Sequence, residues 1–419
     1  MTFDTLDALE TRNPADRESD LMARLPQLVA LAKRAPGWQR ILDGFDPATI
    51  DSRAALATLP ITRKSDLKTL QKEPAPFGGL NATPLSALAR VFVSPGPIYD
   101  PEGRGQDYWR FARPLYAGGV RDGGLLQNCF SYHFTPAAFM VEGGAFRIGC
   151  TVIPAGSGQT EMQVLAMADL KPDTYVGTPS FLRIIIEKAR EMGADISSVR
   201  NAVMGAEALP QSLRAWFQEN GVPNVIQTYA TADIGSIAYE TVTDGVINPG
   251  MVLDEDLIVE IVRPGSGEPV APGDIGEVVV TSFNPDYPLI RFATGDMSAL
   301  LIDAAPSRCG RTNSRIKGWM GRADQTTKVR AMFVHPSQVE NIVRRHPQVL
   351  KARLVVSGRM ANDAMTLHCE VAGEARPELA AAIVDSIREV TKLRGEVEFA
   401  AAGSLPADGK LIEDARDYT

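Results

Sequence analysis

Hydroxyl, aromatic and carboxylate side chains gather in one short stretch, residues 227–233. Tyr229 offers a ring on which a nucleotide base can stack. Thr231 can donate a hydrogen bond to a phosphate, and the carboxylate of Asp233 can bind Mg²⁺. The same residues also suit an ordinary helix start, with Thr231 or Asp233 as the N-cap. The composition therefore indicates either a nucleotide and metal site or a capped helix.

A second carboxylate, Asp296, follows Arg291 closely, around a tight turn formed by Thr294 and Gly295. A carboxylate can accept hydrogen bonds from both hydroxyls of a diol such as ribose, and Arg291 adds a cation nearby. The alternative is a surface turn with an exposed ion pair, which contributes little to stability.

Residues 205–207, Gly-Ala-Glu, follow a predicted strand. Ligands of open α/β sheets collect outside the carboxyl ends of strands. A loop of small residues at such a place would let a flat ring approach the backbone. An ordinary strand-end turn would have the same composition.

Two isolated residues also bear on chemistry. Lys410 follows a loop with Pro and Gly, and its ammonium would stabilise developing negative charge if the loop reached a reactant. Most loop lysines are only solvated. His133, between Tyr132 and Phe134, could line a pocket with aromatic walls. It could equally be a half-buried histidine with satisfied hydrogen bonds.

The segments that must position these residues alternate between short apolar strands and helices, which predicts an α/β body with a mostly parallel sheet. Strands are expected at 90–94, 125–131, 151–154, 174–177 and 202–204. Helices are expected at 18–34, 107–117, 135–147, 159–168, 181–192 and 210–220. Residues 59–67 predict a turn into a helix capped by Thr62, and residues 95–105 predict a loop.

From residue 256 the apolar period changes to two, and strands 257–262 and 277–282 predict an antiparallel portion. After residue 321 the order of elements predicts a small split-βαβ module. Its helices are expected at 336–345 and 377–393, and its strands at 352–357, 365–371 and 396–400. We expect a large domain, 1–321, and a small mobile α+β domain, 322–419, joined by a hinge.

The bulk composition excludes several classes of function. The chain has 419 residues and a net charge of −8 without a long basic run, so nucleic acids and acidic membrane surfaces are not expected partners. The sequence has no apolar run long enough to span a membrane. The four cysteines are scattered and form no CxxC pair, which argues against a disulfide framework or zinc site and favours a cytoplasmic location.

Taken in order, these motifs resemble those of the phenylacetate–CoA ligase family of adenylate-forming enzymes over nearly the whole chain. The segments that carry the resemblance are 59–67 (LPITRKSDL), 176–180 (VGTPS), 205–207 (GAE), 289–296 (LIRFATGD), 321–324 (GRAD), 334–340 (VHPSQVE) and 404–410 (SLPADGK).

The resemblance implies a two-step reaction. A carboxylate attacks the α-phosphate of ATP to give an acyl-adenylate, and the small domain then turns about Asp324, withdraws Lys410 and admits CoA. It also makes a homodimer plausible. The candidate residues are Lys410, Asp324 and His133 for catalysis, Gly205, Ala206, Glu207, Thr228, Tyr229, Thr231, Arg291, Asp296 and Arg322 for the nucleotide, Tyr132, Phe134, Thr178 and Pro179 for the acid, and Asp233 for Mg²⁺.

The sequence departs from the family pattern in four places. The phosphate loop expected after Val93 is replaced by 94–99, in which two prolines remove amide donors. Asp233 stands for a glutamate, Ala331 for a glycine, and 309–312 resemble a Cys-rich loop that lacks its metal partners.

The main hypothesis is therefore an ATP-dependent ligase that joins an aromatic or similar carboxylic acid to CoA. The alternative keeps the fold but not ATP activation, and binds AMP, an acyl-adenylate or an acyl-CoA as a CoA-independent adenylating enzyme, transferase or regulator. A purely structural partner of a related enzyme is a third, remoter hypothesis.

Overall fold

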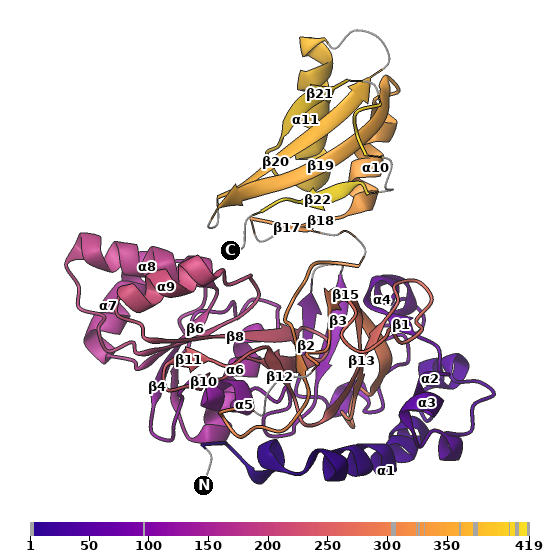
Figure 1. The fold of residues 1–419 in the computed structure, drawn as a ribbon, viewed down its shortest axis with the longest axis vertical. Coiled ribbons are helices and arrows are strands. Elements are labelled where there is room, and N and C mark those ends of the chain that lie inside the picture. The colour runs from indigo at the N-terminus through magenta and orange to yellow at the C-terminus, as the bar shows by residue number, and fades with distance from the viewer. Residues whose placement is uncertain are drawn as a thin grey trace. The chain divides into compact units, whose positions relative to one another are not determined.

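The chain folds into two compact units, Met1–Met320 and Gly321–Thr419, each described here by itself (Figure 1). The computed structural model describes residues 4–94, 97–302, 307–323, 325, 327–330, 332–359, 362–371, 376–401, 403–406 and 410–416. The division lies one residue before the boundary expected from the sequence. Asp324, the expected hinge residue, lies outside the described residues.

The large unit is built around an eight-stranded sheet with the order β16-β12-β9-β8-β7-β6-β4-β5. Its strands are β4 (Leu125–Asn128), β5 (Thr151–Ile153), β6 (Thr174–Gly177), β7 (Asn201–Met204), β8 (Asn224–Thr231), β9 (Gly235–Tyr239), β12 (Met251–Leu253) and β16 (Arg315–Ile316). The five strands β5, β4, β6, β7 and β8 pair in parallel, whereas β9, β12 and β16 pair antiparallel. The predicted mostly parallel sheet is confirmed.

Helices cover both faces of this sheet (Figure 1). The helices are α5 (Ala112–Ala117), α6 (Ala137–Ile148), α7 (Thr160–Leu170), α8 (Pro179–Met192) and α9 (Gln211–Glu219). Successive strand residues point to opposite faces. Val176 and Val203 accordingly pack in the core with α5 and α6, whereas Tyr175 and Ala202 pack in the core with α7, α8 and α9.

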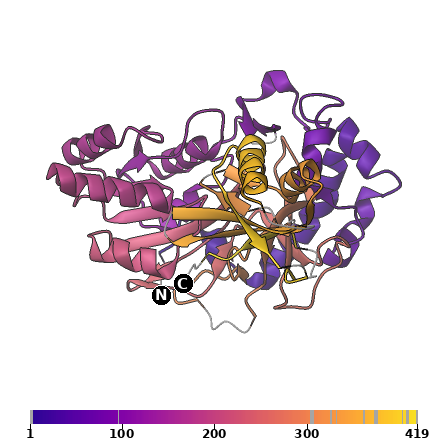
Figure 2. The same ribbon diagram turned by 90° about the horizontal axis from the view of Figure 1, so that it is seen from above.

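The rest of the large unit shares a third core between N-terminal helices and a four-stranded sheet of order β1-β15-β14-β13. Its elements are η1 (Ala8–Thr11), α1 (Pro14–Ala32), α2 (Pro36–Ile41), η2 (Pro47–Thr49), α3 (Arg53–Leu56), β1 (Thr62–Arg63), α4 (Lys64–Leu70), η3 (Leu85–Ala87), β13 (Leu257–Val262), β14 (Gly276–Ser282) and β15 (Leu289–Ser298). The hairpin of β10 (Val242–Thr243) and β11 (Val246–Ile247) is separate, and its Val242 and Ile247 pack against the core that contains α5 and α6. Figures 1 and 2 both place α1–α4 at the opposite end of the unit from α7–α9.

Two helix starts differ from the expectation. Thr62 is not a cap, because it lies buried in β1, and α4 begins at Lys64 after Arg63, whose side chain makes no capping bond. The helix expected from residue 107 begins only at Ala112. Asp107 and Arg110 have positive φ angles, and the Asp107 carboxylate accepts hydrogen bonds from the backbone N–H groups of Phe111 and Ala112.

The loop expected at 95–105 is also wrong in part. Residues Ile98–Glu102 form β3, which pairs antiparallel with β2 (Arg90–Ser94). A proline is tolerated in such a two-stranded ribbon, because an edge strand need not use every N–H group. The composition of Pro and Gly therefore concealed a hairpin.

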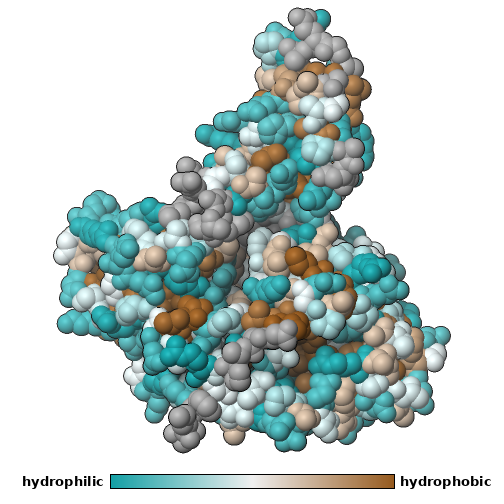
Figure 3. Space-filling model, viewed as in Figure 1, coloured by the Kyte–Doolittle hydropathy of each residue, from teal (hydrophilic) through white to brown (hydrophobic). Residues whose placement is uncertain are grey.

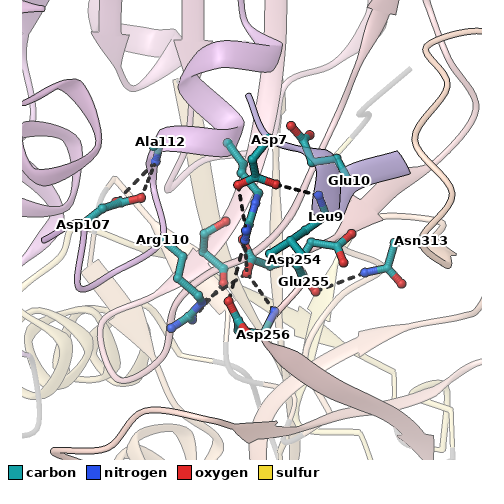
Figure 4. Close-up of polar contacts among 12 residues, drawn as sticks. Asp7, Leu9, Glu10, Asp107, Arg110, Ala112, Asp254, Glu255, Asp256 and Asn313 are labelled. Carbon is teal, nitrogen blue, oxygen red and sulfur yellow. Dashed lines mark hydrogen bonds and ion pairs between the residues drawn. The ribbon is translucent and has the colours of Figure 1, made fainter. Parts of the chain in front are cut away.

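A buried network of ion pairs ties the N-terminal segment to the residues after β12 (Figure 4). Arg17 Nε lies 2.7 Å from a carboxylate oxygen of Glu255, and Arg113 contacts both Asp7 and Asp254, at 3.0 and 3.4 Å. Arg311, in the segment that resembles a Cys-rich loop, pairs with Glu10. Ion pairs hold this loop to the N-terminal segment.

The small unit has a four-stranded sheet of order β21-β20-β19-β22 and a separate hairpin, β17 with β18. Its elements are β17 (Thr327–Val329), β18 (Met332–Val334), α10 (Pro336–Arg345), β19 (Val349–Arg359), β20 (Asn362–Val371), α11 (Pro377–Thr391), β21 (Glu396–Ala400) and β22 (Ile412–Asp414). Apolar patches interrupt the mainly hydrophilic surface of the chain (Figure 3). Within the described ranges, no helix combines the length and apolar character needed to cross a membrane.

Candidate functional site

Most predicted site residues of the large unit lie at one edge of the eight-stranded sheet. Strands β4, β6, β7 and β8 pair in parallel, so their carboxyl ends share an edge. The residues that follow or end these strands are Tyr132, His133 and Phe134 after β4, Thr178 and Pro179 after β6, Gly205, Ala206 and Glu207 after β7, and Thr228, Tyr229 and Thr231 in β8. This edge is where ligands of open α/β sheets bind.

The loop after β7 is closely fitted to β8. A Cβ atom at Gly205 would lie 3.0 Å from Thr228 Oγ1, and that hydroxyl donates to the Met204 carbonyl at 3.0 Å. Gln227 Nε2 donates to the Glu207 carbonyl at 3.1 Å, and the Glu207 carboxylate accepts from the N–H group of Ser180. The small-residue loop is thus held in one conformation beside β8.

Tyr229 and Asp296, which are 67 positions apart, meet directly. The Tyr229 hydroxyl donates to Asp296 Oδ2 at 2.9 Å, and Trp319 Nε1 donates to Asp296 Oδ1 at 3.1 Å. The Asp296 N–H group also donates to Thr294 Oγ1 at 3.1 Å. These bonds fix a carboxylate and an aromatic ring side by side where β8 and β15 approach. Trp319 was not among the predicted residues.

Arg291 does not belong to this group, which corrects the expectation that it binds the nucleotide. It has a positive φ angle, and its guanidinium is buried away from solvent. All five N–H groups are used: two donate to Glu260, and three to the carbonyls of Ala57, Leu59 and Gly267. Arg291 therefore ties residues 57–59 to the four-stranded sheet.

Two threonines perform local structural tasks. Thr178 is the N-cap of α8, where its hydroxyl accepts from the Phe181 N–H group. Thr231 Oγ1 accepts from the Ile234 N–H group in the turn between β8 and β9. The alternative of a capped helix start at Thr231 or Asp233 is wrong, because β9 follows and not a helix.

Asp233, the predicted Mg²⁺ ligand, is paired with a lysine. It lies in the β8–β9 turn with a fully buried side chain, and its Oδ2 accepts a hydrogen bond from Lys64 Nζ. Burial opposes the charge of Lys64, but the carboxylates of Asp233, Asp100 and Asp296 outweigh it and raise the pKa of the ammonium. A Mg²⁺ ion does not fit Asp233 in this arrangement, because an ammonium already neutralises the carboxylate.

Asp100, in β3, is a further buried acid beside the pair of Asp233 and Lys64. Only 1% of the residue is exposed, and neither carboxylate oxygen has a hydrogen bond of normal geometry to a described residue. Burial and the neighbouring charge of Asp233 hold the pKa of Asp100 well above its usual range, although Lys64 and Ser94 oppose the shift. Sequence reasoning missed both Lys64 and Asp100. Lys64 lay within the segment 59–67, but nothing local linked it to Asp233.

The segment expected to hold a phosphate loop, 94–99, lies partly outside the described residues, because 95 and 96 are not among them. Ser94 pairs with Ile98, which leaves three residues, 95–97, between the strands. The N–H group of Val93 donates to the Phe134 carbonyl at 2.9 Å and fixes the end of β2. Two of the three connecting residues are prolines and carry no N–H donor.

The aromatic residues after β4 differ in their surroundings. Tyr132 is half-buried, and its hydroxyl donates to Glu142 and accepts from Asn128 Nδ2, each at 2.9 Å. His133 and Phe134 are exposed, with ring centroids 4.9 Å apart in an edge-to-face contact. Tyr132 is thus held within the loop, and the other two rings face solvent.

The remaining predicted residues belong to the small unit. Lys410 is exposed, and Arg322 is half-buried at the start of the unit.

Comparison with known proteins identifies close relatives. Residues 122–284 match the family model described as AMP-binding enzyme. A phenylacetate–coenzyme A ligase from Thermus thermophilus is 32% identical, over 80% of this chain and 77% of its own length. Another from Escherichia coli is 28% identical, over 98% of this chain and 97% of its own.

Solved structures share the fold. A 2-hydroxyisobutyryl-CoA ligase, solved in complex with 2-HIB-AMP and CoA in the thioesterification state, matches with a TM-score of 0.80 at 23% identity, and the match covers 98% of this chain and 92% of that one. An amide bond synthetase from Marinactinospora thermotolerans matches with a TM-score of 0.56 at 18% identity, covering 93% and 92%.

Proposed function

Since the chain belongs to the phenylacetate–CoA ligase family of adenylate-forming enzymes, we propose that it activates a carboxylic acid as an acyl-adenylate and transfers the acyl group to CoA. In the first step a carboxylate oxygen attacks the α-phosphorus of ATP, and pyrophosphate leaves. In the second step the CoA sulfur attacks the acyl carbon, AMP leaves, and the thiol proton goes to solvent. An aromatic or similar apolar acid is the proposed substrate.

The observation that carries the proposal is the continuous set from Gly205 to Asp296. The loop at Gly205 packs on Thr228, the next residue is Tyr229, and Tyr229 donates to Asp296. We assign the ribose hydroxyls to Asp296, and the adenine to the ring of Tyr229 and the backbone of 205–207. A fixed carboxylate needs no reorganisation when it accepts two hydroxyl donors, which favours binding.

The acid is assigned to the neighbouring strand ends. Tyr132, Thr178 and Pro179 follow β4 and β6, next to the strand that carries the adenine loop. His133 and Phe134 would border the same region from the exposed side. The proposed role of Lys410 is to stabilise negative charge at the α-phosphate, and Asp324 remains the proposed hinge.

A second candidate function is supported by the residues near Asp233. By sequence, Pro95 and Pro97 carry no N–H group with which to hold β- and γ-phosphates, and the ammonium of Lys64 is paired with Asp233. Both features affect pyrophosphate and leave the AMP moiety untouched. In this alternative the chain binds AMP, an acyl-adenylate or an acyl-CoA, and acts as a transferase, regulator or CoA-independent enzyme.

Two measurements on the full chain separate the candidates. Pyrophosphate release is measured with ATP and a panel of aryl and alkyl acids, and AMP binding is measured by calorimetry. For the main proposal, Lys410→Ala lowers pyrophosphate release by roughly a hundredfold or more. The exposed Arg394→Ala in the same unit serves as the matched control and leaves the rate unchanged.

The outcomes point in different directions. The second candidate is favoured if wild type binds AMP, Asp296→Asn weakens that binding, and no acid gives pyrophosphate release. A folded protein that neither binds AMP nor releases pyrophosphate contradicts both.

A further inference from the structure

Lys64 is placed by backbone pairing and not by its side chain alone. Strand β1 runs parallel to β15, with Thr62 opposite Phe292 and Arg63 opposite Ala293. Lys64 is the next residue and begins α4, so the chain delivers its ammonium beside the strand that carries Asp296. About a quarter of the Lys64 side chain is exposed, whereas its partner Asp233 is fully buried.

The ammonium is paired with Asp233, and the charges of two further acids also act on it. The charges that raise the pKa of Lys64 are those of Asp233, Asp100 and Asp296, in that order. Asp233 Oδ1 and both oxygens of Asp100 are buried without a hydrogen bond of normal geometry to a described residue. Carboxylate oxygens are the usual ligands of a divalent cation, yet within the described ranges no group of three His, Cys, Asp or Glu residues is arranged to hold a metal ion. The lysine is the cation that the structure provides for these carboxylates.

We propose that Lys64 is a built-in substitute for a divalent metal at Asp233, so that nucleotide binding by this chain does not depend on Mg²⁺. The inference rests on the proposed nucleotide site. A metal on Asp233 would have to displace the ammonium or lie next to it, and like charges in a poorly solvated region repel strongly. The acidic residues near Asp233 are thus neutralised by a lysine of the same chain.

The test is the binding of Mn²⁺, a paramagnetic stand-in for Mg²⁺, followed by electron paramagnetic resonance on the full chain. Wild type has no Mn²⁺ site that depends on Asp233, so Asp233→Asn leaves its Mn²⁺ binding unchanged. Lys64→Met frees Asp233 and Asp100 and tightens Mn²⁺ binding by at least about tenfold, and the double variant Lys64→Met/Asp233→Asn loses that gain. Lys68→Met, an exposed lysine of the same helix, is the matched control and behaves as wild type.

A second readout uses wild type alone, in case Lys64→Met fails to fold. Calorimetry without an acid substrate gives the same ATP affinity with Mg²⁺ and with EDTA, because the two ligands are not coupled. The proposal is overturned if wild type binds one Mn²⁺ that Asp233→Asn abolishes, if Mg²⁺ tightens ATP binding, or if folded Lys64→Met gains no Mn²⁺ affinity. None of the Mn²⁺ measurements needs acid, CoA or turnover, so a failed ligase assay leaves them intact.

Discussion

Replacing Arg291 by methionine tests whether this arginine holds the fold or binds the nucleotide. The side chains of Arg291 and Glu260 are almost fully buried, with 3% and 8% exposed. Methionine keeps the apolar stem but removes all five donors. Glu260 then remains as a buried charge without its partner, and three carbonyls lose a hydrogen bond.

The expected loss of stability follows from that count. Breaking a buried ion pair from one side costs about 3–5 kcal/mol, most of it from the charge left behind. Burial already raises the pKa of Glu260 above its ordinary value of 4.5, although the charges of Arg291 and Arg53 lower it. Without Arg291 the folded-state pKa rises further, so the folded variant binds its proton more tightly than the unfolded chain does. Its stability then falls as pH rises above the unfolded pKa, so the loss is larger at about pH 8 than at about pH 5.

Urea unfolding followed by tryptophan fluorescence at the two pH values measures this loss. The double variant Arg291→Met/Glu260→Gln removes the unpaired charge of Glu260. It therefore recovers part of the stability, and its stability depends less on pH. The AMP affinity of folded Arg291→Met equals that of wild type. A variant as stable as wild type but about tenfold weaker for AMP would refute the structural role and restore Arg291 as a nucleotide ligand.

Three further substitutions test the assigned site. Gly205→Ala places a Cβ atom 3.0 Å from Thr228 Oγ1, so we expect a loss of about 1 kcal/mol in unfolding free energy and weaker AMP binding in calorimetry; unchanged affinity would argue against an adenine loop at 205–207. Tyr229→Phe removes the donor to Asp296 and should weaken AMP binding by about 1 kcal/mol, roughly fivefold, and an equal affinity would mean that the hydroxyl does not position Asp296. Thr178→Ala removes the N-cap of α8 and should lower stability by about 1 kcal/mol; a changed KM for the acid at unchanged stability would show contact with substrate instead.

Local patterns predicted those parts of the site that depend on strand order. The apolar strands and small-residue loops placed Gly205, Thr228 and Tyr229 at one edge, because adjacent parallel strands end together. The pairing of Lys64 with Asp233 spans 169 positions and depends on how β1 aligns with β15, which no local period encodes. Asp100 was hidden because a Pro- and Gly-rich segment was interpreted as a loop. Arg291 sits within a recognisable motif, but its positive φ turns the side chain toward Glu260, and composition does not reveal that turn.

The adenosine half of the site and the half near Asp233 therefore differ in their electrostatics. On the adenosine side, Asp296 accepts hydrogen bonds from two neutral donors, Tyr229 and Trp319. On the other side, the carboxylate of Asp233 is paired with Lys64, Asp100 lies beside it, and Pro95 and Pro97 carry no N–H donor. The transfer of an acyl group from an adenylate to CoA uses only the first half, whereas the release of pyrophosphate depends on the second. The thioester-forming step, started from a supplied acyl-adenylate, should therefore proceed equally well with Mg²⁺ and with EDTA, and a metal requirement in that step would show that it depends on more than the adenosine half.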